Sequence, residues 1–265
     1  MSMFEFDFMQ RAFIAGILVA AVCPLIGSFL VVRRQSLIGD GLGHIAFAGV
    51  CAGWLMEWQP VISATVFTLL GALAIERVRS MRSEFTDMVL AIFFYSGMAL
   101  AIILASMQGS GGMSLSSFLF GSIVTVSAQD LYIMAFLGLC VFLSVIVFYR
   151  QFLYMCFDEE AAKVSGMATG RLNVLLSVLT AMTIAVSMRI VGLLLVSAMM
   201  VIPVACSLPW KKDFAGTIML SVVFGLICVV FGLGASFYTD LAPGGTIVLT
   251  AAAFFAFSEL YNRKK

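Results

Sequence analysis

Asp40 and His44 are the two side chains in this sequence whose types and spacing best suit metal binding. They lie four residues apart in RRQSLIGDGLGHIAFAG (33–49), and His44 is the only histidine among 265 residues. In an α-helix, residues i and i+4 share a face, so the carboxylate and the imidazole would point the same way. These are ligands that zinc prefers, and manganese or iron is also possible. The pair therefore predicts a metal station, and the alternative is a structural Asp–His hydrogen bond.

The chain that carries this pair is strongly hydrophobic. Hydrophobic residues make up 62% of it and charged residues 11%, and its mean hydropathy is +1.11. Soluble domains carry about 25% charged residues. The composition predicts an all-α, polytopic integral membrane protein, in contact with membrane lipid and forming one transmembrane domain over residues 1–265. A net charge of +1 gives no indication of a nucleic-acid partner.

Eight apolar runs are long enough to cross a bilayer as helices, and a ninth is interrupted by Asp40 and His44. A membrane helix takes about 20 mostly apolar residues. The eight runs are about 12–32, 60–78, 87–107, 131–149, 172–188, 190–208, 215–236 and 246–261, and the ninth is about 40–56. We favour nine spans, with eight as the alternative. The stretch 115–127 is too short to cross and predicts a non-spanning helix on one side.

The basic residues predict the orientation of these spans. With nine spans, all 15 lysines and arginines except Arg11 and Arg189 fall on one face of the membrane. Cytoplasmic loops carry the excess of Lys and Arg in membrane proteins. The N-terminus is therefore expected outside and the C-terminus in the cytoplasm.

This orientation predicts the depth of the candidate ligands. Counted from Arg34 at the cytoplasmic boundary, Asp40 is about 9 Å inside and His44 about 15 Å, near the midplane of a core about 30 Å thick. Ionisable groups at such depth cost about 2.5–3.5 kcal/mol each and usually face a bundle interior or a water-filled path. We therefore place both ligands on a cation path. Arg33 and Arg34 would form its cytoplasmic exit, where fixed positive charge disfavours a resting cation.

Two other residues are candidates for the same path. Cys51 lies seven residues after His44 on a similar helix face, and it is either a soft third ligand or a packed thiol. Asp240, in YTDLAPGGTIV, either guides a cation into the entrance or caps the last helix. Two ligands are too few for a closed metal site, and a symmetric dimer would supply four.

The one sizeable polar loop, FDEEAAKVSGMATGR (157–171), predicts a short capped helix on the cytoplasmic side. Negative charge at a helix start is favoured by the helix dipole, and such an exposed helix suits docking into a groove of a soluble subunit. An ordinary capped loop is the alternative. The candidate coupling residues are Asp158, Glu159, Glu160, Ala161 and Gly166. The sequence contains no G-x-x-x-x-G-K-[ST] motif, so we expect no enzymatic activity here and ATP hydrolysis, if any, by a separate chain.

Several of these segments, in this order, resemble the membrane permease subunits of bacterial ABC importers for zinc and manganese. The similar segments are 29–50 (FLVVRRQSLIGDGLGHIAFAGV), 117–131 (SFLFGSIVTVSAQDL), 157–166 (FDEEAAKVSG), 188–207 (MRIVGLLLVSAMMVIPVACS) and 238–249 (YTDLAPGGTIVL). The start MFEFDFMQRAFIAG and the run RRQSLIGDGLGH look closer to the zinc members.

The resemblance implies a high-affinity zinc uptake permease of a bacterial inner membrane. It implies a homodimer, two cytoplasmic ABC ATPase subunits that use ATP, and an extracytoplasmic metal-binding protein. It maps the metal path onto Asp40 and His44 and the coupling helix onto about 158–166. The implied fold is that of the vitamin B12 permeases without their first span. Transported Zn²⁺, or alternatively Mn²⁺ or Fe²⁺, would pass through, and no cofactor would stay bound.

Two other functional classes remain open at this point. A non-transporting membrane scaffold would have no metal-dependent phenotype and no ATPase partner. A secondary carrier driven by an ion gradient would transport in vesicles without ATP.

Overall fold

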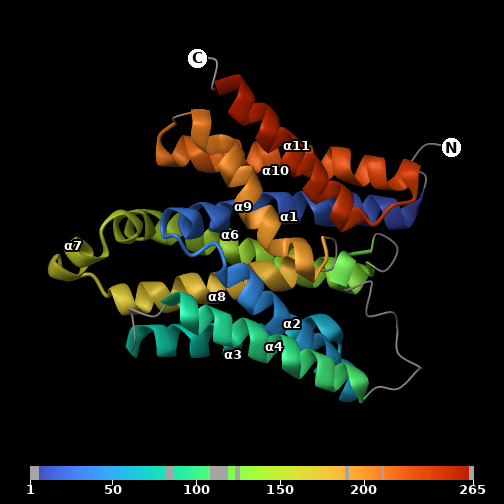
Figure 1. Cartoon of the computed structure of the whole chain (residues 1–265), viewed down its shortest axis with the longest axis horizontal. Helices are drawn as coiled ribbons and strands as arrows, with labels where there is room; N and C mark the ends of the chain where they lie inside the picture. The colour runs from blue at the N-terminus through green and yellow to red at the C-terminus, as the bar shows by residue number, and fades with distance from the viewer. Residues whose placement is uncertain are drawn as a thin grey trace.

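Eight helices in the structure are long and apolar enough to cross a membrane. The structure is a computed structural model, and it describes residues 6–81, 86–107, 119–122, 126–188, 191–210 and 212–262. The long helices are α1 (Asp7–Val32), α2 (Ile38–Leu55), α3 (Pro60–Met81), α4 (Thr86–Ser106), α6 (Ala128–Phe157), α8 (Thr169–Ser187), α10 (Phe214–Thr239) and α11 (Pro243–Asn262). Two short helices, α7 (Glu159–Val164) and α9 (Val196–Ser207), complete the α-helical set in these ranges (Figure 1).

The all-α membrane bundle is thereby confirmed, with the lower of the two predicted counts of spanning helices. The difference lies in the predicted span 190–208, where the structure has the 3₁₀ turn Leu193–Leu195 followed by the 12-residue α9. A helix of that length covers about 18 Å, less than the roughly 30 Å of a bilayer core. Gly192 has φ +82°, so a right-handed helix cannot continue through it. The predicted short helix at 115–127 falls largely on 108–118 and 123–125, outside the described residues.

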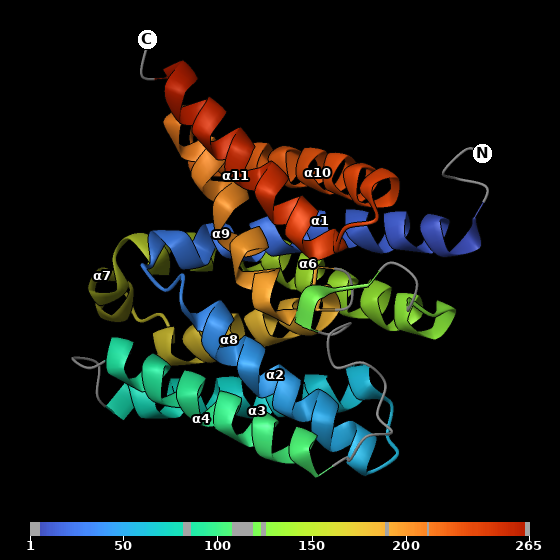
Figure 2. The ribbon, with the colours of Figure 1, turned by 45° about the vertical axis from the view of Figure 1, so that its right-hand side comes forward.

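The broken segment still connects the two ends of the bundle. In Figures 1 and 2 the chain passes from the end of α8 to the start of α10 through α9, and the two termini lie at opposite ends. The short α7 lies beyond the ends of α6 and α8, at the end of the bundle away from the N-terminus. The favoured count of nine crossings stays a prediction, because α9 is shorter than a spanning helix and the described residues contain eight helices of spanning length.

The helices form two packed groups joined by α8 and α9. One group places α2 against α3 and α4, and the other places α1 and α11 against α10. Helix α8 packs on α3 and α6, while α9 contacts α1, α2, α10 and α11. In the most apolar window of α1 and of α2, 72% of residues are buried, against 22% in α4, α6 and α11. Helix α2, which carries the candidate ligands, is therefore an inner helix.

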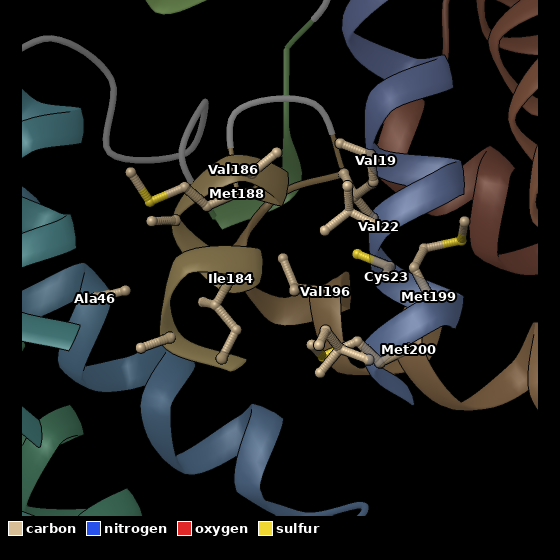
Figure 3. Packing of buried hydrophobic residues seen from close by; sticks show 14 of the residues in the cluster. Val19, Val22, Cys23, Ala46, Ile184, Val186, Met188, Val196, Met199 and Met200 are labelled. Carbon is tan, nitrogen blue, oxygen red and sulfur yellow. The ribbon is translucent and has the colours of Figure 1, made fainter. Parts of the chain in front are cut away.

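The hydrophobic core lies where α1, α2, α8 and α9 meet, and Figure 3 shows its side chains. The labelled residues come from α1 (Val19, Val22, Cys23), α2 (Ala46), α8 with the residue after it (Ile184, Val186, Met188) and α9 (Val196, Met199, Met200). Met199 and Met200 are almost fully buried. Although α9 is short, this packing holds it in the middle of the molecule, where its first turn reaches α2.

Candidate metal path and coupling site

Asp40 and His44 lie in the first half of α2, where that helix is flanked by α9 and α4. The hydroxyl of Ser197, in the first turn of α9, donates a hydrogen bond to Asp40 Oδ1. The His44 ring packs edge-on against Phe94 of α4, with ring centroids 4.5 Å apart and an interplanar angle of 78°. Both Asp40 and His44 are half-buried. The predicted pair is thus on one inner helix, partly accessible, with its carboxylate oriented by a neighbouring helix.

The hydrogen bond of Asp40 tests the alternative interpretation, in which Asp40 and His44 only form a structural hydrogen bond with each other. Its carboxylate is bonded to Ser197 and not to His44, so the structure does not contain the Asp–His hydrogen bond of that alternative. Among the described residues there is no group of three or more His, Cys, Asp or Glu side chains that could hold a metal ion. One protomer therefore offers two ligands, as the sequence predicted, and no closed site.

The contact between α2 and α9 depends on a small residue beside Asp40. A Cβ placed on Gly39 would lie 3.0 Å from Ser197 Cβ, tighter than an ordinary carbon–carbon contact of about 3.5–4.0 Å. Glycine lets the two backbones approach closely, and this approach brings the Ser197 hydroxyl within reach of the carboxylate. Ser197 was missed in the sequence because it is a single serine in an apolar run.

Cys51 and Asp240 lie in different surroundings from this pair. The side chain of Cys51 is fully buried in the hydrophobic core, which fits the packed-thiol alternative. Asp240 is exposed and ends α10 with the left-handed backbone angles φ +55° and ψ +33°. Helix α11 begins three residues later at Pro243, so Asp240 closes α10 and does not occupy the N-cap position of the last helix. A cation-guiding role for Asp240 stays a prediction.

The predicted coupling segment contains a short capped helix. The backbone N–H of Ala161 donates to Asp158 Oδ1 at 2.8 Å, which caps the start of α7. Beyond the helix, Gly166 has φ +82°, and its N–H bonds to the Lys163 carbonyl at 3.0 Å. Val164 is 90% exposed at this end of the bundle. The segment thus presents a capped, exposed helical turn, as the sequence predicted.

Arg33 is bound to this helix through a partly buried hydrogen-bonded cluster. Its Nη2 donates to Glu159 Oε2 at 2.8 Å and its Nη1 to Asn173 Oδ1 at 2.6 Å. Asn173 Nδ2 donates to Glu159 Oε1 at 3.1 Å, which closes the triangle. The side chain of Arg33 is only 6% exposed. Burial alone would raise the pKa of Glu159, but the Arg33 guanidinium and hydrogen bonds from Asn173 and Lys163 hold it below its ordinary value.

Arg33 and Arg34 are therefore not a pair of equivalent free charges. Arg33 is buried and ion-paired, while Arg34 is exposed with φ +56° in the turn between α1 and α2. The exit role predicted for these arginines stays a prediction, and Arg33 has a structural partner that the sequence did not indicate.

A second buried ion pair lies beside the first. Arg79 Nη2 and Glu76 Oε2 of α3 are 2.6 Å apart, and the Ser177 hydroxyl of α8 donates to the same carboxylate oxygen at 3.2 Å. Both ion pairs line a cavity of about 770 Å³ between the ends of α1, α3 and α8. The spacing of Glu76 and Arg79 at i and i+3, near the end of an apolar run, is the signal that could have identified this pair.

Comparison with known proteins decides the family. The ABC 3 transport family matches residues 5–262. The chain belongs to the ABC 3 transport family. The permease resemblance found in the motifs is confirmed at this level, and the match covers every spanning helix.

Individual relatives of this family member align over almost the full chain. A probable metal transport system membrane protein of Treponema pallidum is 36% identical over 249 residues, covering 94% of this chain and 93% of the relative. The manganese import system permease protein ScaB of Streptococcus gordonii is 32% identical, covering 96% and 91%. Among solved structures, PsaBC from Streptococcus pneumoniae in complex with Fab contains a chain with TM-score 0.87 and 34% identity, covering 97% of this chain and 92% of that one.

Proposed function

We propose that this ABC 3 family member is the permease subunit of an ATP-driven importer that carries a divalent transition metal into the cytoplasm. The observation that carries the proposal is the Asp40–His44 pair on an inner helix, half-buried, with a carboxylate oriented by Ser197. An oxygen ligand in the first turn of α2 and a nitrogen ligand one turn later suit a cation such as Mn²⁺, Fe²⁺ or Zn²⁺.

The proposed assembly is a homodimer with two cytoplasmic ATPase subunits and an extracytoplasmic metal-binding protein. A second copy is proposed because two ligands from one protomer do not complete a coordination shell, whereas two copies supply four around a symmetry axis. The exposed α7 is the proposed docking helix for the ATPase. With α7 on the cytoplasmic side, the proposed orientation has the N-terminus outside and the C-terminus in the cytoplasm. This orientation agrees with the distribution of basic residues.

Mn²⁺ is the first candidate metal and Zn²⁺ the second. Relatives at 31–32% identity are named for manganese, and an oxygen–nitrogen pair without a thiolate suits this harder ion. Zinc is kept because the start of the chain and the motif around Asp40 resemble zinc permeases, and because carboxylate and imidazole also bind Zn²⁺.

In the proposed mechanism, metal released by the binding protein enters between two protomers. It is held by the two Asp40–His44 pairs, while the Ser197 hydroxyl keeps its hydrogen bond to Oδ1 and orients each carboxylate. Binding and hydrolysis of ATP in the partner subunits move α7 and open the path toward the cytoplasm. His44 must be neutral to bind metal, so protonation of its imidazole in acid should weaken uptake.

The test is uptake of radiolabelled Mn²⁺ and Zn²⁺ by the complete complex in proteoliposomes, with His44→Ala and Asp40→Asn as variants. Both should reduce uptake of the transported metal by about tenfold or more, since each removes a ligand. Asp87→Asn is a matched control, because Asp87 also lies in the first turn of a helix but is exposed.

Three results would contradict the proposal. Normal uptake by His44→Ala at normal protein level removes the metal-path role. Uptake that needs no ATP indicates a secondary carrier, and a complex that takes up none of Mn²⁺, Zn²⁺ and Fe²⁺ indicates a scaffold.

A further inference from the structure

We propose that Arg33, Glu159 and Asn173 form a tether that transmits movement of α7 to the start of α2, and so positions Asp40 during transport. These three are positioning residues, because they act through α2 and form hydrogen bonds with one another, not with Asp40 or His44. The inference rests on the proposed function, in which an ATPase moves α7. It goes beyond that function by naming the route from the coupling helix to the metal ligands.

The tether joins three elements that are far apart in the sequence. Arg33 directly follows α1, Glu159 is the first residue of α7, and Asn173 lies in the first turns of α8. Each of the three residues makes at least two hydrogen bonds inside the triangle, at 2.6 Å, 2.8 Å and 3.1 Å. Charge-assisted hydrogen bonds of this length are among the strong ones in proteins. A displacement of Glu159 must therefore carry Arg33 with it or break two such bonds.

The corner after Arg33 is built to pass such a displacement to α2. The N–H of Arg34 bonds to the Val31 carbonyl at 3.1 Å, and that of Gln35 bonds to the Leu30 carbonyl at 2.9 Å. This bonding pattern, with a left-handed residue in the middle, is a Schellman turn. The N–H of Ile38 then bonds to the Gln35 carbonyl at 3.1 Å as α2 begins. Six residues, 34–39, separate Arg33 from Asp40, and the three backbone hydrogen bonds donated by Arg34, Gln35 and Ile38 hold this short connection in place.

The adjoining cavity gives the tether room to move. Arg33 and Glu159 line the same cavity of about 770 Å³ as the Glu76–Arg79 pair. A close-packed interior resists displacement of its side chains, whereas polar groups beside an open cavity can change partners without a steric clash. A tether that only held α7 in place would have no use for such a space.

The alternative is that the triangle merely stabilises α7. Both alternatives predict that breaking it lowers stability, because an unpaired buried charge is costly. They differ in the coupling between hydrolysis and transport. A purely structural triangle leaves the amount of metal moved per ATP unchanged in the protein that folds, whereas loss of the tether lowers it.

The experiment measures Mn²⁺ uptake and ATP hydrolysis together, in proteoliposomes containing the complete complex, with Zn²⁺ as the second probe. Arg33→Gln and Glu159→Gln should lower metal moved per ATP by about tenfold or more while hydrolysis stays within about twofold, as expected for loss of a charge-assisted bond. Arg77→Gln is the matched control, because Arg77 lines the same cavity but is exposed and lies outside the triangle. It should leave the ratio unchanged.

A rescue variant distinguishes the tether from general damage. Arg33→Glu combined with Glu159→Arg restores the ion pair in reverse, and the amide of Asn173 can rotate to serve both ends. We expect the double variant to recover much of the ratio that each single change loses. If Arg33→Gln fails to assemble, Glu159→Gln on the partly exposed α7 tests the same loss of metal moved per ATP.

The outcomes separate this inference from the proposed function. A wild-type complex that hydrolyses ATP but moves neither metal contradicts the proposed function and the tether with it. A wild-type complex that transports, with single variants that keep the wild-type ratio, contradicts the tether alone. A double variant no better than the single ones, or a control that uncouples equally, also overturns the tether.

Discussion

Gly27 of α1 lies against the backbone of α9, and replacing it by alanine tests whether the position of that short helix matters. A Cβ on Gly27 would overlap the Met200 carbonyl oxygen and lie 2.7 Å from the carbonyl carbon. Ordinary carbon–carbon contacts are about 3.5–4.0 Å, so the two helices would have to separate by roughly 1 Å. No rotamer change relieves the overlap, because the opposing atoms belong to the backbone.

The energetic cost follows from this geometry. Overpacking in a filled core typically costs about 1–3 kcal/mol, and a backbone clash belongs at the upper end. Alanine favours a helix over glycine by about 1 kcal/mol, which offsets part of this cost. The net loss in the free energy of unfolding is therefore about 2 kcal/mol. Met200 is one turn after Ser197 on α9, so the same displacement weakens the hydrogen bond to Asp40. We therefore expect Gly27→Ala to lose stability and metal uptake together.

The assay is thermal unfolding of the purified protein, followed by Mn²⁺ uptake in the reconstituted complex. A loss of about 2 kcal/mol corresponds to a decrease of about 4–8 °C in Tm for a chain of this size class. Gly234→Ala on α10 is the control, because nothing lies within 4 Å of its Cβ position. It should melt at or above the wild-type temperature. A Gly27→Ala variant that melts and transports like the wild type would refute the reasoning.

Two further predictions concern the polar contacts of α2 and α7. Ser197→Ala should raise the KM for Mn²⁺ by about tenfold to a hundredfold, because it removes a hydrogen bond to a charged group worth about 1.5–3 kcal/mol, while Ser197→Thr should retain most of the affinity. Equal KM values in uptake assays would show that the hydroxyl does not orient Asp40. The lowered pKa of Glu159 means that its ionised form stabilises the fold above an ordinary pKa of 4.5, and that this contribution disappears as the pH falls through the lower folded value. The Tm of the wild type should therefore exceed that of Glu159→Gln at pH 7 and approach it below pH about 4.5, and a difference independent of pH would contradict an ionic role.

The spanning helices and α7 could be predicted because their signals are local. Hydropathy over about 20 residues identifies a membrane helix wherever the chain supplies one. The acidic start of α7 and the glycine after it are within a few residues of the helix they delimit. Even the interrupted span of α2 was recognisable, since Asp40 and His44 are the only Asp, Glu, Lys, Arg or His residues in it.

The length of α9 could not be predicted in the same way. Residues 190–208 form an apolar run as long as a true span, and hydropathy does not distinguish a complete helix from a short one. What prevents the helix from starting earlier is the positive φ at Gly192, a conformation that glycines inside helices do not adopt. The decisive information is the packing of α9 against α1, α2, α10 and α11, which is tertiary.

The partners of the charged residues were missed for a related reason. Ser197 is 157 residues from Asp40, and Glu159 is 126 residues from Arg33. A single sequence contains no signal that pairs positions at such separations. The sequence therefore indicated that Arg33 stands at a membrane boundary, but not that its charge is neutralised by the coupling helix.

Helix α2 contacts α3 and α4 on one side and α9 on another, and these contacts differ in extent. The difference predicts which of them opens first when α2 moves. Helix α2 packs much more extensively against α3 and α4 than against α9, to which Asp40 is joined by one hydrogen bond beside Gly39. A pull through Arg33 would move α2 with α3 and α4 as one body, since separating them exposes a large packed surface. The junction that opens is then the one between Asp40 and Ser197. In the proposed coupling step, opening this contact would free the Asp40 carboxylate when the metal leaves toward the cytoplasm, so we expect the weak contact with α9 to be the one that changes.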